Sequence, residues 1–148
     1  MTYGTQNIAE KKLIRDSRAL VDSYPKVALT VDCVIFGFDE GELKILLIER
    51  NEEPFKNWWA LPGYIVEQDE SIDHAAERIL YELTGLRGIY MDQFYTFGDV
   101  NRHPQGRVIT VAYYAMIRLS GSKDLKPVSN YASKAVWIRS EEHTSELQ

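Results

Sequence analysis

Apolar residues recur with the period of a helix near the N-terminus and with the alternation of strands over much of the remaining chain. Between Asn7 and Tyr24 the apolar positions fall roughly on one helical face, basic side chains lie elsewhere, and Pro25 ends the pattern. This segment is therefore predicted to be an amphipathic helix. Residues 1–26 are treated as an N-terminal extension, and the domain itself is expected over residues 27–138.

The domain is predicted to combine strands with a second helix. Val27–Phe38 and Leu43–Arg50 are β-rich runs joined by a glycine-bearing turn, which is typical of a hairpin. A helix is expected from Ser71 to Thr84, with Asp69 or Ser71 as its N-cap and Gly85 as a left-handed C-terminal cap. Further strands are expected at residues 64–67, 88–97, 107–119 and 134–138, and residues 59–63 are expected to begin a short strand and a turn. The pattern predicts an α/β (α+β) sandwich with a mixed sheet.

Composition narrows the class of protein. The 148 residues are 45% apolar and 26% charged, which fits one soluble globular domain. Their net charge of −5 argues against this segment alone being a nucleic-acid clamp. The single cysteine, Cys33, excludes a disulfide framework within the chain and is predicted to be a small core residue. The sequence resembles neither a signal peptide nor a membrane span, so a cytoplasmic protein is expected.

The last ten residues, 139–148, match the in-frame translation of a common DNA-sequencing adapter and are set aside as a non-native tail. The natural sequence is then expected to stop at Ile138, directly after a strand-like run. Because this is an unusual place for a domain to end, we predict a truncated reading frame.

Residues 61–86 carry the most specific motif of the chain. They resemble the Nudix box, G-x5-E-x7-R-E-U-x-E-E-x-G-U, in which U is a bulky aliphatic residue. Aligning the lead-in and the closing Thr-Gly-Leu places Tyr64 at the box glycine, Glu70 at the first glutamate and Arg78 at the arginine. The resemblance covers residues 27–138. It implies a Nudix-type α/β/α sandwich with a mixed sheet, truncated before its last helix.

The metal-binding part of this motif is largely lost. Nudix hydrolases cleave a diphosphate linked to another group, using divalent cations that neutralise the phosphates and activate water. The glutamates of the R-E-x-x-E-E helix supply oxygen ligands, and their three positions here are Ile79, Glu82 and Leu83. We therefore expect no cofactor and no metal, with Glu70 and Glu82 as the remaining candidate ligands. Mg²⁺ is expected only if the chain is a hydrolase after all.

The two replacements also extend an apolar stripe. Ile79 and Leu83 continue the helical face of Ala75 and Leu80, which suits a packed helix or an uncharged ligand. Arg78 and Glu82 are four residues apart and can pair on the helix surface. Glu82 is then either a solvated partner of the arginine or a remnant of the functional site, and the pattern leaves both open.

The degenerate box and its flanks resemble the Nudix-related transcriptional regulators. The stretches that carry the comparison are Glu53–Gly63 and Phe97–Val108. In that bacterial family a Nudix domain binds an effector, either ADP-ribose or a pentose such as arabinose, and a C-terminal winged helix-turn-helix binds DNA. The resemblance implies a homodimeric, catalytically inactive sensor whose DNA-binding half is missing here.

Two other functions stay open. One is a Nudix hydrolase that cleaves a nucleoside diphosphate-linked substrate with Mg²⁺, using Glu70, Glu82 and a loop carboxylate such as Asp99. The other is a protein-interaction module without a small ligand, because a fold does not fix a function.

Ligand contacts are expected on loops and strand ends around the former catalytic cleft. Arginine forks would hold a phosphate or sugar hydroxyls, loop side chains would supply further polar groups, and aromatic rings would stack on a base or a sugar. The predicted residues are Arg50, Trp59, Tyr64, Asp99, Asn101 and Arg107.

Structural explanations compete with several of these roles. Arg50 can solvate a strand end, Trp59 can belong to the core, and His103 can be an exposed loop residue. Asp32 stands alone in an apolar strand, so it lies either on a polar face or hydrogen-bonded near the cleft, and the sequence does not decide between them.

Overall fold

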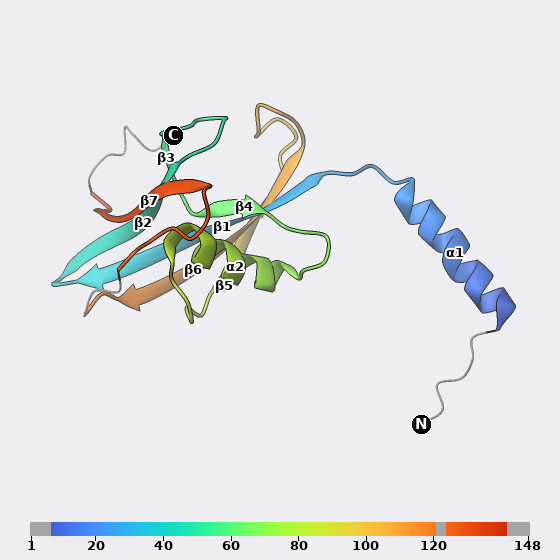
Figure 1. The fold of residues 1–148 in the computed structure, drawn as a ribbon, viewed down its shortest axis with the longest axis horizontal. Helices are drawn as coiled ribbons and strands as arrows, with labels where there is room; N and C mark the ends of the chain where they lie inside the picture. Colours follow the sequence, from blue (N-terminus) through green and yellow to red (C-terminus); the bar gives the residue numbers. More distant parts are fainter. Residues whose placement is uncertain (1–6, 121–123, 142–148) are drawn as a thin grey trace, which may run out of the picture.

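The computed structural model describes residues 7–120 and 124–141, which form two helices and a seven-stranded mixed sheet (Figure 1). The order along the chain is α1 (Ile8–Asp22), β1 (Ala28–Asp39), β2 (Glu42–Arg50), β3 (Trp59–Ala60), β4 (Gly63–Ile65), α2 (Ile72–Thr84), β5 (Asp92–Phe97), β6 (Val108–Arg118) and β7 (Ala132–Arg139). The main path of the sheet is β3-β2-β1-β6-β5, while β4 pairs with β1 and β7 with β2. The long β1–β6 pair is parallel and the others are antiparallel. The predicted mixed sheet is confirmed.

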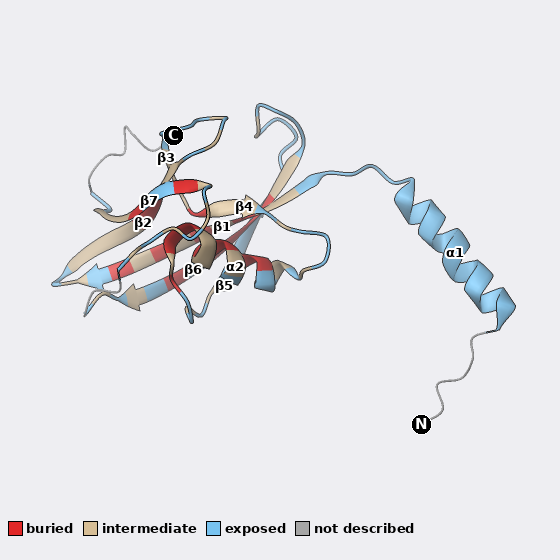
Figure 2. Ribbon diagram, in the orientation of Figure 1, coloured by how far each residue is buried: buried red, intermediate tan, exposed pale blue. Residues whose placement is uncertain are grey.

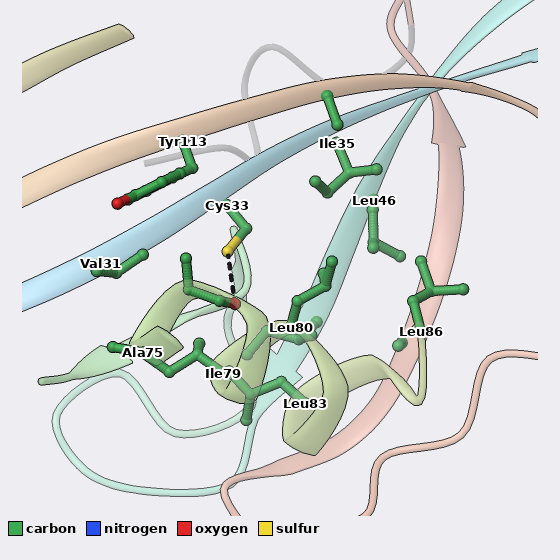
Figure 3. Close-up of a cluster of buried hydrophobic side chains, with 14 of the residues drawn as sticks. Val31, Cys33, Ile35, Leu46, Ala75, Ile79, Leu80, Leu83, Leu86 and Tyr113 are labelled. Carbon is green, nitrogen blue, oxygen red and sulfur yellow. Dashed lines mark hydrogen bonds between the residues drawn. The ribbon is translucent and has the colours of Figure 1, made fainter. Parts of the chain in front are cut away.

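Helix α2 covers one face of the sheet and forms the core with it (Figure 3). The Ser71 side chain accepts a hydrogen bond from the backbone N–H of His74 (3.1 Å), and Gly85 ends the helix with a φ of +82°. The apolar face of α2 packs against alternate residues of β1. Among these, Cys33 donates its S–H to the carbonyl of Ala76 (3.7 Å), and burial, followed by the nearby Asp32, raises its pKa to about 12. The cysteine is thus the core residue predicted from sequence.

The opposite face of the sheet, which we call the open face, is covered only in part among the described residues. Thr110 and Ala112, the partners of Thr30 and Asp32 on β6, are buried there, with 2% of each surface exposed. Because side chains alternate along a strand, Thr30, Asp32 and Val34 point away from the core that contains Val31 and Cys33. Several large hydrophobic residues of the sheet are exposed, and exposed residues of the strands are pale blue in Figure 2. They include Phe38, Phe94, Tyr95, Phe97, Tyr114 and Met116.

Helix α1 stands apart from the sheet (Figure 1). Asn7 and Glu10 form a capping box, with each side chain accepting from the other residue's backbone N–H (2.8 and 3.2 Å). Every residue of α1 is exposed. Within the described residues, no helix is both long enough and apolar enough to cross a membrane.

Several strand boundaries differ from those predicted. The strand expected from Gly88 begins at Asp92, because Gly88 takes a φ of +69° and turns the chain before pairing with β6 starts. Strand β7 runs to Arg139, which pairs with Lys44 although it was assigned to the tail. The rest of the tail from residue 142 lies outside the described residues. The expectation of a missing last helix stays a prediction.

Candidate functional site

Arg78 is the centre of the polar network in the Nudix-like segment. Its Nε and Nη2 atoms donate to the two carboxylate oxygens of Glu70 at 2.9 and 2.6 Å, and Nη1 donates to Glu82 at 3.1 Å. Nη2 also donates to the carbonyl of Ile65 at 3.0 Å. The predicted Arg78–Glu82 pair is therefore confirmed, but the bidentate partner is Glu70. The hydrogen bonds from Arg78 are the main reason that the pKa of Glu70 falls to about 2.

This network does not leave a ligand set for a divalent cation. Ile79 and Leu83 are buried in the core, with 0% and 1% of their surfaces exposed. Glu70 and Glu82 both direct carboxylate oxygens to Arg78. Among the described residues, no group of three or more His, Cys, Asp or Glu is arranged to hold a metal. Since Mg²⁺ needs several oxygen ligands in octahedral geometry, the side chains present here do not fit it.

A second polar group lies on the open face of the sheet. We call Asp32, Arg50 and Arg102 the Asp32 cluster. Arg102 is anchored by its Nη1 atom, which donates to the Thr110 hydroxyl (2.8 Å), and Thr110 in turn hydrogen-bonds the hydroxyl of Thr30 (2.7 Å). Arg50 is anchored by its Nε atom, which donates to the carbonyl of Pro54 (2.9 Å). The three residues of the cluster come from the centre of β1, the end of β2 and the loop at residues 98–107.

The carboxylate of Asp32 has room only because glycine stands opposite it. Gly63 pairs with Asp32 across β1 and β4, and a Cβ at that position would come within 2.0 Å of Asp32 Oδ1. No described residue forms a hydrogen bond or close ion pair with this carboxylate. Burial raises its pKa to about 6, against the opposing charges of Arg102 and Arg50. Sequence reasoning left the position of Asp32 open, and the structure places it on the polar end of the open face.

Asp32→Asn is expected to stabilise the protein above pH 6 by about 1–3 kcal/mol. The carboxyl ionises near 3.8 when unfolded and near 6 when folded, so the folded state holds the extra proton between these values. Stability of the wild type should therefore fall as the pH rises from about 4 to 6 and stay lower above it. Urea unfolding from pH 4 to 8 measures the free energy of unfolding of both proteins. The same pH dependence in wild type and Asp32→Asn would contradict the prediction.

The two aromatic residues that were predicted to contact the ligand, Tyr64 and Trp59, both contact other residues of the fold. Tyr64 stacks on Tyr131 with ring centroids 4.1 Å apart, and its hydroxyl donates to Glu52 (3.1 Å). Burial is the main reason that the pKa of Tyr64 is raised. Trp59 is half-buried, and the ammonium of Lys134 lies 5.3 Å from its ring centroid. Stacking of either ring on a ligand stays a prediction.

The predicted loop contacts lie in and around residues 98–107. Asp99, Asn101 and Arg107 are exposed. His103 is half-buried, and its Nδ1 atom accepts from the backbone N–H of Gln105 (3.2 Å). Arg102, which sequence reasoning did not select, is the loop residue anchored to the sheet. Its signal in the sequence was only its place next to the predicted residue Asn101.

Two grooves lie elsewhere, between α2 and residues 86–93, with volumes of about 550 and 340 Å³. Of the predicted site residues, only Arg78 lines either groove. The smaller groove contains a hydrogen-bonded chain in which Gln93 donates to Tyr113 (3.0 Å) and Tyr113 donates to Asp73. Burial, the largest cause, raises the pKa of Tyr113 to about 12.

Comparison with known proteins adds the family context. The chain is 38% identical over 121 residues to the ADPR responsive transcriptional repressor NtrR of Acinetobacter baylyi. The aligned region covers 80% of this chain and 47% of the repressor. The chain is 37% identical over 90 residues to an ADP-ribose pyrophosphatase of Methanocaldococcus jannaschii, covering 61% and 51% of the two chains. The chain thus spans about half the length of these curated relatives.

Solved structures agree with the fold. The NUDIX domain of Shewanella oneidensis NrtR complexed with ADP ribose matches with a TM-score of 0.74 and 29% identity, covering 90% of this chain and 84% of that chain. NrtR from the same organism complexed with a 27mer DNA matches with a TM-score of 0.63 and 32% identity, covering 75% and 50%.

The predicted resemblance to Nudix-related regulators is therefore confirmed. The NUDIX domain family model matches residues 26–148. The chain belongs to the Nudix domain family.

Proposed function

We propose that this chain is the effector-binding domain of a transcriptional regulator and that it binds an ADP-ribose-type ligand without cleaving it. The observation that carries the proposal is the replacement of two metal-binding glutamates by the core residues Ile79 and Leu83. The third, Glu82, is paired with Arg78. The similarity to a repressor that responds to ADPR and to a NUDIX domain complexed with ADP ribose supports the ligand class.

Hydrolysis of the same ligand is the second candidate function. It is favoured by the 37% identity to an ADP-ribose pyrophosphatase. In that case the carboxylates that replace the lost ligands would have to come from elsewhere, such as the exposed Asp99. The two functions share a ligand and differ only in turnover, so one experiment separates them.

We further propose that the whole protein is a cytoplasmic homodimer that binds DNA through a winged helix-turn-helix outside this chain. A Shewanella oneidensis relative was crystallised with a 27mer DNA. The net charge of −5 makes the present segment a poor partner for a phosphate backbone on its own. In this arrangement the Nudix domain binds the ligand, and the winged helix-turn-helix domain supplies the positively charged surface that binds DNA.

Titration with ADP-ribose tests the proposed function. We expect saturable heat release in isothermal calorimetry, both with Mg²⁺ and with a chelator, because the described residues form no carboxylate cage for the ion. After long incubation with Mg²⁺, ³¹P NMR should show only intact ADP-ribose. Appearance of AMP and ribose 5-phosphate at a rate proportional to protein would establish the hydrolase instead. Absence of binding would remove ADP-ribose as the effector.

A further inference from the structure

Asp32 is a carboxylate without a partner in a place where a carboxylate is costly. It lies on β1 between β4 and β6, and both neighbouring positions, Gly63 and Ala112, lack a polar side chain. Within the described residues nothing donates a hydrogen bond to it. A half-buried ionised group in this state weakens the fold, so the packing of the sheet does not account for its presence.

The two arginines of the Asp32 cluster keep unused donors. A guanidinium carries five N–H donors in a planar fork. Arg102 uses Nη1 for Thr110 and for the carbonyl of Val108 (3.3 Å), and Arg50 uses Nε for Pro54. Their other N–H groups have no hydrogen-bond partner among the residues that the structure describes. Each fork is therefore fixed at one atom and available at the others.

Neither arginine neutralises Asp32 by a close ion pair, although the positive charge of each lowers its pKa. The face thus presents one acceptor group and two donor groups that are close enough for their charges to act on one another. An anion alone would be repelled by the carboxylate, and a neutral sugar alone would leave the arginine forks unmatched. A ligand with hydroxyl donors next to a phosphate matches both, because carboxylates accept from hydroxyls and arginine forks bind phosphate oxygens.

We propose that Asp32 is the specificity-determining residue of the effector site, accepting hydrogen bonds from ribose hydroxyls while Arg50 and Arg102 hold the adjoining phosphate. This rests on the proposed function and narrows it. The ligand class is a phosphorylated pentose such as the one contained in ADP-ribose, and a free pentose is a poor ligand. Gly63 is part of the same proposed site, since any side chain there would displace the Asp32 carboxylate.

The competing explanation is structural, with Arg102 tying the loop at residues 98–107 to the sheet. That role needs the Arg102–Thr110 hydrogen bond and the Thr110–Thr30 contact, but it does not need a carboxylate at Asp32. The two explanations therefore separate at Asp32→Asn, which keeps the shape of the side chain and removes its charge. A structural role predicts unchanged ligand discrimination in this variant.

The test is calorimetric titration at pH 8 of the wild type, Asp32→Asn and Arg102→Gln with ADP-ribose, inorganic pyrophosphate and free ribose. We expect Asp32→Asn to bind ADP-ribose about 10- to 100-fold more weakly, and pyrophosphate as well as or better than the wild type. Arg102→Gln should weaken both anionic ligands. Free ribose should bind to none of the proteins at concentrations that saturate the wild type with ADP-ribose.

Asp39→Asn is the matched control, because it removes a carboxylate from the far end of the same strand, where Asp39 pairs with Lys44. It should bind like the wild type. Thermal melts exclude unfolding as the cause, since Asp32→Asn is expected to be the more stable protein at this pH. Wild-type affinity of Asp32→Asn for ADP-ribose would overturn the inference and leave the proposed function standing. A wild type that binds no ADP-ribose would overturn the proposed function itself.

Discussion

Ile79→Glu and Leu83→Glu, the two changes that restore the glutamates of the Nudix box, are each expected to destabilise the domain by about 3–5 kcal/mol. Both side chains are almost fully buried against the sheet, with 0% and 1% of their surfaces exposed. A carboxylate there must be either desolvated or held protonated, and the described core offers it no cationic partner. Urea unfolding at pH 7 measures the loss, and the double variant should be unfolded without denaturant.

This outcome distinguishes a helix whose positions 79 and 83 belong to the core from one whose positions 79 and 83 belong to a hydrolase centre. If the site were a hydrolase centre that tolerates aliphatic replacements, glutamates at these positions would point toward solvent and gain Mg²⁺-dependent activity. Ile79→Val is the matched control for packing alone, and it should cost only about 0.5–1.5 kcal/mol. Glutamate variants with wild-type stability and Mg²⁺-dependent cleavage of ADP-ribose would contradict both the core assignment and the proposed inactivity.

The secondary structure around α2 could be predicted because local sequence determines it. Ser71 supplies the side-chain cap that the helix start requires, and Gly85 adopts the left-handed conformation that ends it. The alternation of apolar residues in β1 likewise predicted a strand with one buried face. Each of these signals depends on a few neighbouring residues and is independent of the rest of the fold.

The candidate site was harder to predict, because its contacts join distant positions. Thr30 meets Thr110 only through the parallel register of β1 and β6, which no local pattern specifies. Arg102 reaches Val108 and Thr110 because the loop at residues 98–107 folds back onto the start of β6. The bidentate contact between Arg78 and Glu70 crosses from the helix to the turn before it, so helix periodicity alone indicated only Glu82.

Both polar groups contain a carboxylate near arginine, yet their pKa values move in opposite directions. In the Nudix-like segment, hydrogen bonds from Arg78 outweigh burial and lower the pKa of Glu70 to about 2. At Asp32, burial outweighs the charges of Arg102 and Arg50 and raises the pKa to about 6. The first pair is complete within the fold and has a structural role. The second is incomplete, which is why we assign ligand recognition to it.

Arg78→Ala is expected to destabilise the domain by about 2–4 kcal/mol at pH 7. The change leaves Glu70, whose side chain is only 9% exposed, without its bidentate partner, and it also removes the contact with Glu82. Solvent screens Arg78, whose side chain is 20% exposed, so the loss is smaller than for a fully buried ion pair. The stability of Arg78→Lys should lie between those of the wild type and Arg78→Ala, because an ammonium cannot donate through two parallel N–H groups.

The pH dependence identifies Glu70 as the partner that matters. Its pKa is 4.5 in an ordinary setting and about 2 in the fold, so the unfolded state binds the extra proton between these values. The Arg78–Glu70 contribution is therefore complete above pH 4.5 and disappears as the pH falls through 2. The free energies of unfolding of wild type and Arg78→Ala should converge over this range.

Arg87→Ala is the control, because it removes only a surface guanidinium that lies 3.9 Å from the Tyr81 ring centroid. This change should lower the free energy of unfolding by less than about 1 kcal/mol. A constant difference between wild type and Arg78→Ala from pH 7 to 2 would show that the arginine stabilises the helix by packing rather than through Glu70.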